Sequence, residues 1–81
     1  MSILRISAVK QLTGHRSHSS IYTAIRVGLF TKPVQIGPRS VGWPEDEVLK
    51  INSARIAGKS ESDIRVLIDQ LHVKRTSLVM G

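Results

Sequence analysis

The residues best suited to chemistry lie close together in the segment HRSHSSIYTAIR, residues 15–26. Its two histidines, His15 and His18, are three positions apart and lie among serines. Histidines at this spacing could bind a metal ion, and a histidine beside a serine could act as the base that activates a nucleophile. A metal site needs further ligands, and a Ser/His pair needs an acid that orients the imidazole. Residues 1–44 contain no Asp or Glu, and the chain has no Cys. We therefore expect no catalytic residue, metal or cofactor, and no enzymatic activity.

Three consecutive acids, Glu45, Asp46 and Glu47, are the other candidates for chemistry, because paired carboxylates can act as general acid and base. They directly follow Pro44, and proline is favoured at the first position of a helix. Acids in a first turn also interact favourably with the helix dipole. The sequence therefore predicts a helix that begins at residues 44–47 rather than a pair of catalytic carboxylates.

The net charge is +6, and it is distributed unevenly along the chain. The second half, residues 45–81, contains six basic and six acidic residues. The first half, residues 1–44, contains six basic residues and no acidic one: Arg5, Lys10, Arg16, Arg26, Lys32 and Arg39. A half-chain without carboxylates suits a surface that faces a polyanion such as the DNA backbone.

Two short helices must position the segment 15–26. We predict the first over residues 7–13, with Ser7 as its N-cap and Gly14 after its end, and the second over 18–27, with Ser17 as its cap and Gly28 as its stop. Helical periodicity buries one face of the second helix and leaves an opposite face of small polar side chains and one arginine: Ser19, Thr23 and Arg26, with Tyr22 beside them. Two such helices joined by a tight turn predict a helix-turn-helix.

The next segment predicts a β-hairpin over residues 34–43, with a turn at Gly37-Pro38-Arg39-Ser40 that carries Arg39 at its tip. Period-two alternation places Val34, Ile36, Val41 and Trp43 on the inner side and Gln35 and Gly42 on the outer side. Beside a helix-turn-helix, such a hairpin is a wing. Phe30 and Trp43 are expected in the core.

Two further helices are predicted. The third runs to about residue 57, and the fourth is capped at Ser60 and carries an apolar stripe that either packs on the domain or forms a dimer interface: Ile64, Leu67, Ile68, Leu71 and Leu78. We therefore expect a mainly α fold with a small β-hairpin wing. A winged helix-turn-helix over 1–57 is followed by a C-terminal helical extension over 58–81.

The stretch from Leu4 to Val48 resembles the AlpA family of phage- and genomic-island-encoded regulators. The string from Ile36 to Trp43 is the most specific part. The matching elements, in order, are Leu12-Thr13-Gly14, Ser20-Ile21-Tyr22, Ile25-Arg26, Gly28-Leu29-Phe30, Lys32-Pro33-Val34, Ile36-Gly37-Pro38-Arg39, Val41-Gly42-Trp43 and Glu47-Val48. The resemblance implies a small winged-helix DNA-binding protein, related in fold to excisionases and MerR-type regulators.

The expected function is sequence-specific binding of double-stranded DNA by a transcriptional regulator of prophage or genomic-island type. Helix 18–27 would enter the major groove, and the wing would reach the backbone or the minor groove. Arg26 would read a guanine or bind a phosphate. The expected DNA contacts are Arg16, Ser17, His18, Ser19, Ser20, Tyr22, Thr23, Arg26, Lys32 and Arg39.

Two alternatives remain at this point. The protein could be an excisionase that acts at an attachment site, or a protein-interaction module that inhibits a partner regulator. A homodimer or a cooperative multimer on DNA, and an integrase, are further expected partners. The N-terminus lacks a signal-peptide pattern and no apolar run is long enough to span a membrane, so we expect a cytoplasmic, nucleoid-associated protein without a membrane partner.

Overall fold

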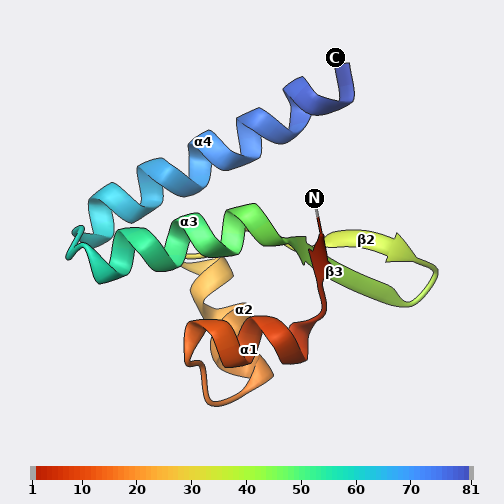
Figure 1. Ribbon diagram of the computed structural model, residues 1–81, viewed down its shortest axis with the longest axis horizontal. Helices are drawn as coiled ribbons and strands as arrows, with labels where there is room; N and C mark the ends of the chain where they lie inside the picture. The colour runs from red at the N-terminus through yellow and green to blue at the C-terminus, as the bar shows by residue number, and fades with distance from the viewer. Residues whose placement is uncertain (1, 81) are drawn as a thin grey trace.

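The computed structural model describes residues 2–80, with side chains described for residues 2–76 (Figure 1). The elements in chain order are β1 (Ile3–Leu4), α1 (Ile6–Thr13), α2 (His18–Arg26), β2 (Val34–Gly37), β3 (Ser40–Pro44), α3 (Glu45–Ile56) and α4 (Glu61–Met80). The three strands form one antiparallel sheet in the order β1-β3-β2. The predicted fold class is thereby confirmed: a mainly helical domain with a hairpin beside a pair of short helices, followed by a C-terminal helix.

Most helix ends follow the predicted signals. Gly14 and Gly28 adopt φ of 76° and 83°, a left-handed conformation that glycine adopts without steric cost. Ser17 accepts the backbone N–H of Ser20 at 3.2 Å and so caps α2. The prediction that Ser7 caps α1 is wrong. The helix begins one residue earlier, after Arg5, because β1 ends at Leu4 and the extended Arg5 leads directly into the first turn.

The sheet contains a strand that the sequence did not predict. β1 pairs with β3 through Ile3 opposite Pro44 and Leu4 opposite Trp43. Pro44 therefore ends β3 and precedes α3, instead of forming its first helical residue. The backbone N–H of Glu45 donates to the Ser2 carbonyl oxygen at 2.8 Å, which ties the start of the chain to the start of α3.

The alternation predicted for the hairpin is wrong at two positions. Gly42 is buried rather than outward, because β1 covers it; a Cβ there would lie 2.5 Å from the Ile3 Cγ2 atom. Ile36 is 46% exposed, because the pairing of β2 with β3 shifts register between Gln35 and Gly37. Val34 and Val41 are half-buried, and Trp43 is fully buried as predicted.

One core joins all four helices of the described residues to β3. Its members are Val9, Ile21, Ala24, Phe30, Trp43, Val48, Ile51, Ile64, Ile68 and Leu71. Trp43 lies at its centre, where its indole N–H donates to the Thr31 carbonyl oxygen at 2.9 Å and its ring meets that of Phe30. The core thereby connects the second helix to the hairpin.

The apolar stripe of α4 packs on the domain, which is one of the two predicted alternatives. Ile64, Ile68 and Leu71 are 2–4% exposed and face α3, so their side chains are not available for a dimer contact. Leu67 is half-buried at the edge of the same core. Leu78 falls among the residues whose side chains are not described.

Candidate nucleic-acid interface

The exposed face of α2 is a shallow hollow lined by small polar side chains. Ser19, Tyr22, Thr23 and Arg26 surround a space of about 410 Å³. The Thr23 hydroxyl donates to the Ser19 carbonyl oxygen at 3.0 Å, and an Arg26 guanidinium N–H points back to the Thr23 hydroxyl at 3.5 Å. Because the serine and threonine hydroxyls stay close to the backbone, Tyr22 and Arg26 are the two large side chains among these four.

Hydrogen bonds connect the turn between α1 and α2 to the first turn of α2. Ser20 is half-buried, and its hydroxyl donates to the Ser17 carbonyl oxygen while lying 3.2 Å from Nδ1 of His15. Ser20 thus turns toward the inter-helix turn rather than toward the exposed face. Arg16 and His18 are exposed beside it. In the described residues, no three His, Asp or Glu side chains lie close enough together to hold a metal ion.

Tyr22 joins this face to the hairpin. Its ring meets the Trp43 ring edge-on, with centroids 6.4 Å apart and planes 62° apart, whereas the ring of Phe30 meets Trp43 from another direction at 6.1 Å. Tyr22 remains 46% exposed, so its outer part still faces solvent. Trp43 therefore fixes α2 relative to β3.

The hairpin carries Arg39 to the end of a projecting arm. Gly37 pairs with Ser40, so Pro38 and Arg39 form a two-residue tip, and both are exposed. Gln35 braces the turn by donating from its side-chain amide to the Gly37 carbonyl oxygen at 3.1 Å. Figure 1 shows the hairpin extending away from the helices, so the structure does not bring Arg39 into the α2 hollow.

The connecting segment, residues 27–33, leads from α2 to β2 and is held by cations of the C-terminal helices. Arg65 donates to the Val27 carbonyl oxygen at 3.0 Å, and Arg55 donates to that of Leu29 at 3.3 Å. Arg75 donates to the Lys32 carbonyl oxygen at 2.7 Å. These arginines satisfy backbone groups where α2 ends and the wing begins, whereas the Lys32 side chain is exposed.

Sequence reasoning missed this clamp, formed by Arg65, His72 and Arg75, because the basic residues of the second half were counted only toward its neutral net charge. Arg65, His72 and Arg75 are spaced by seven and three residues, which places them on one side of α4. That spacing is the signal that could have revealed a second functional stripe beside the apolar one.

Arg75 also forms an ion pair with Glu47 at the start of α3. Glu47 is 5% exposed, and two N–H groups of Arg75 donate to its carboxylate oxygens at 2.8 and 2.5 Å. The first-turn acids were interpreted only through the helix dipole, but Glu47 is a buried structural partner of α4. The Glu47–Arg75 contact is the one ion pair among the side chains of residues 2–76. Within this range, the six basic residues of the first half therefore have no carboxylate partner.

His72 is half-buried and contacts the same connecting segment. Its Nε2 accepts the backbone N–H of Lys32 at 3.1 Å, which requires the neutral ring. Burial lowers the pKa of His72 below its ordinary value of 6.5, and the nearby Arg75 lowers it further, whereas Glu47 acts in the opposite direction. Burial, with Arg55 beside it, likewise lowers the pKa of His15.

We expect the stability of the protein to fall on acidification because of these histidines. A folded-state pKa below the unfolded value means that the unfolded chain binds more protons as the pH drops below about 6.5. The stabilisation is complete above pH 6.5 and is lost as the pH falls through the folded pKa. His72→Gln keeps an acceptor for the Lys32 N–H without titrating. Urea denaturation between pH 7 and 5 should therefore show a shallower decline for this variant, and parallel curves would contradict the role of His72.

A basic helix-turn-helix with a projecting hairpin defines the class of winged helix-turn-helix proteins. The profile of the family described as "Prophage CP4-57 regulatory protein (AlpA)" matches residues 2–56, and the chain belongs to this AlpA family, which is a regulatory one. A curated relative, the "Uncharacterized protein ORF88" of Enterobacteria phage P4, is 41% identical over 56 residues, 69% of this chain. The match spans 62% of that relative's length.

No solved structure matches the chain. Within residues 2–80, no helix combines the length and the apolar character that crossing a membrane requires.

Proposed function

We propose that the protein is a sequence-specific DNA-binding regulator of prophage or genomic-island genes. The exposed face of α2 is the observation that carries this proposal, because small hydroxyls around one arginine suit a helix that lies in the major groove. Arg26 would bind a guanine edge or a phosphate from this face. The lack of carboxylates in residues 1–44 supports the same reading, since no acid of that half would repel the DNA backbone.

The remaining basic residues would bind phosphates on either side of α2. Arg16 and His18 precede or open the helix, the Lys32 side chain follows it, and Arg39 at the hairpin tip would reach the backbone or the minor groove. Residues 1–57 would then make the DNA contacts, and residues 58–81 would hold the connecting segment through Arg65, His72 and Arg75.

A gel-shift titration across salt concentrations tests the proposal. Each phosphate that the protein neutralises should add about −0.9 to the slope of log K against log salt. Arg26→Ala should weaken binding by roughly tenfold or more, since a base contact contributes about 1–3 kcal/mol. Arg39→Ala should weaken binding and reduce the magnitude of the salt slope by about 1, as the loss of a phosphate contact does. Lys59→Ala removes the same charge from the loop before α4 and is the matched control, expected to change affinity little. A flat salt response would refute DNA binding.

Ser17 offers a test that separates folding from DNA binding. Ser17→Ala removes the α2 cap and should cost about 1 kcal/mol of unfolding free energy. Ser17→Asp keeps a capping oxygen and adds a charge that favours the helix N-terminus, so its stability should match that of the wild type. The same carboxylate would repel DNA, and we expect weaker binding in the shift assay. Unchanged DNA affinity of Ser17→Asp would place the N-terminus of α2 away from the DNA.

The excisionase alternative shares this DNA-binding surface and differs in the site that it occupies. A transcriptional regulator would bind at promoters, whereas an excisionase would bind an attachment site in several copies, bend it and work with an integrase. Such a protein would act on the nucleoid, in the cytoplasm. Genome-wide mapping of its binding sites there separates the two alternatives. The interaction-module alternative predicts instead that Arg26→Ala and Arg39→Ala leave DNA affinity unchanged but reduce capture of the partner regulator.

A further inference from the structure

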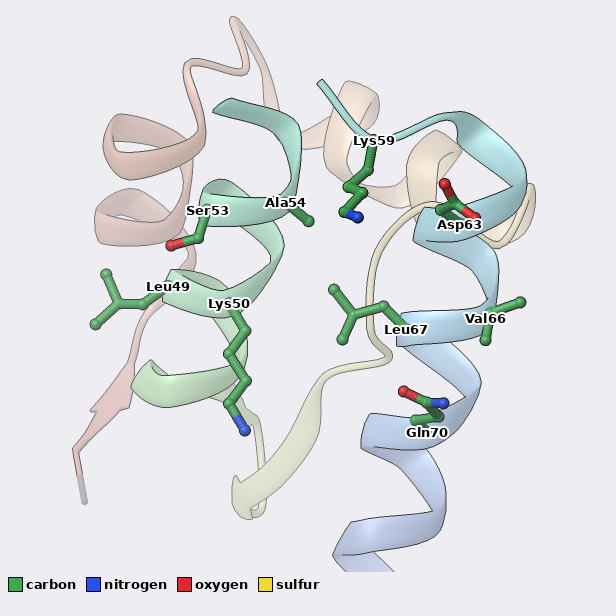
Figure 2. Close-up of a pocket in the computed structure, with 9 residues that line it drawn as sticks. All are labelled: Leu49, Lys50, Ser53, Ala54, Lys59, Asp63, Val66, Leu67 and Gln70. Carbon is green, nitrogen blue, oxygen red and sulfur yellow. The ribbon is translucent and has the colours of Figure 1, made fainter. Parts of the chain in front are cut away.

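A groove runs between α3 and α4, separate from the proposed DNA surface. Its volume is about 510 Å³, and it shares no lining residue with the α2 hollow. In Figure 2 the Ala54 and Leu67 side chains point into the space between the two helices, whereas Leu49 and Val66 lie at its outer edges. The apolar part of the lining comes from both helices, with Leu49 and Ala54 on α3 and Val66 and Leu67 on α4.

Exposed apolar side chains lie at the outer edges of the groove and on the outward faces of both helices. Leu49 and Ile56 are seven residues apart on α3 and are 48% and 86% exposed. Val66 and Val73 are seven residues apart on α4 and are 56% and 68% exposed. Side chains at i and i+7 share one face of a helix, so each helix presents an apolar pair on one side. One member of each pair, Leu49 and Val66, also lines the groove, so the apolar surface of the groove extends to its rims.

The charges around the groove define the partner. Lys50 and Lys59 line it, against one acidic residue, Asp63. Figure 2 shows the Lys59 ammonium group reaching into the space between the helices. A second copy of this face would carry the same net positive charge, which disfavours a symmetric dimer. An acidic partner would pair with them.

The shape of the groove favours a helical partner. α3 and α4 are joined by the short connection 57–60, so they run as an antiparallel pair with the groove along them. An amphipathic helix can lay its apolar residues into such a groove and leave its polar residues at the rim. We infer that the α3/α4 groove binds an amphipathic helix of a second protein whose apolar stripe is flanked by Glu or Asp.

Two synthetic helical peptides test the inference. Both carry leucine at i, i+3, i+7 and i+10; one has glutamate at the flanking positions and the other has lysine. We expect the acidic peptide to bind about tenfold more tightly, because it complements the two lysines. Amide shifts in NMR spectra of the full chain should map to residues of the groove. Equal binding of both peptides, or shifts confined to α2 and the hairpin tip, would overturn the inference.

Matched charge variants exclude general attraction of an acidic peptide to a basic protein. Lys50→Glu with Lys59→Glu should reverse the preference between the peptides, and both positions are exposed, so the thermal transition should be retained. Arg26→Ala with Arg39→Ala removes two charges elsewhere and should leave peptide binding unchanged. A sedimentation measurement that shows a dimer, dissociated by Val66→Asp, would assign the groove to a second copy and overturn the inference. The peptide readout needs no DNA, so it stands or fails apart from the proposed DNA binding.

Discussion

Trp43→Ala is expected to remove a large share of the stability of the protein. Truncation of a buried tryptophan costs about 3–5 kcal/mol, and a domain of this size is stable by only about 4–12 kcal/mol in total. The side chain is fully buried, and the substitution removes both its aromatic contacts and its hydrogen bond to the Thr31 carbonyl oxygen. Urea denaturation followed by circular dichroism measures the loss.

Trp43→Phe is the control for this prediction. It keeps an aromatic ring but removes the indole N–H, so the loss of unfolding free energy should be smaller. That loss comes from the smaller ring and from the Thr31 carbonyl oxygen, which no longer has a donor. We also expect Tyr22 to lose its edge contact in both variants, which NMR shifts of α2 would report. If Trp43→Ala unfolds at the same urea concentration as the wild type, the ring does not organise the core.

Breaking the Glu47–Arg75 pair should produce the second large effect. Glu47→Leu leaves the Arg75 guanidinium in a mostly buried position without its carboxylate, and loss of one partner of a buried pair costs about 3–5 kcal/mol. Arg75 is 21% exposed and keeps its bond to the Lys32 carbonyl oxygen, so the lower end of this range is expected. Chemical denaturation of the single variant measures the cost.

The double variant Glu47→Leu with Arg75→Met separates the charge from the packing. Replacing both partners with apolar side chains removes the stranded charge and should recover much of the stability. The Lys32 carbonyl oxygen then loses its donor, so recovery should stay incomplete. Additive losses in the double variant would show that the two side chains are energetically independent.

Local signals explain why so much of α2 and its surroundings was predictable. The Ser17 cap and the left-handed Gly28 act within a few residues of the helix ends, and the exposed face of Ser19, Thr23 and Arg26 follows from helical periodicity alone. The same holds for the burial of the α4 stripe. These features depend on spacing, which a sequence displays directly.

The features that escaped prediction depend on pairing between distant residues. β1 contains only two residues and forms because Ile3 and Leu4 pair with β3, some forty positions later in the chain. The orientation of Ile36 depends on a register shift, and the role of Glu47 depends on an arginine 28 residues away. No local pattern distinguishes a two-residue strand from a loop, or a carboxylate that is paired from one that is solvated.

The clamp on the connecting segment has a consequence for the order of events during synthesis. Arg65 and Arg75 bind carbonyl oxygens 38 and 43 positions earlier in the chain. When α2 and the hairpin have been translated, these donors do not yet exist, and at about 5–20 residues per second the delay lasts seconds. A nascent chain therefore carries the helix-turn-helix before its connecting segment is held, and these contacts form only after α4 has been made.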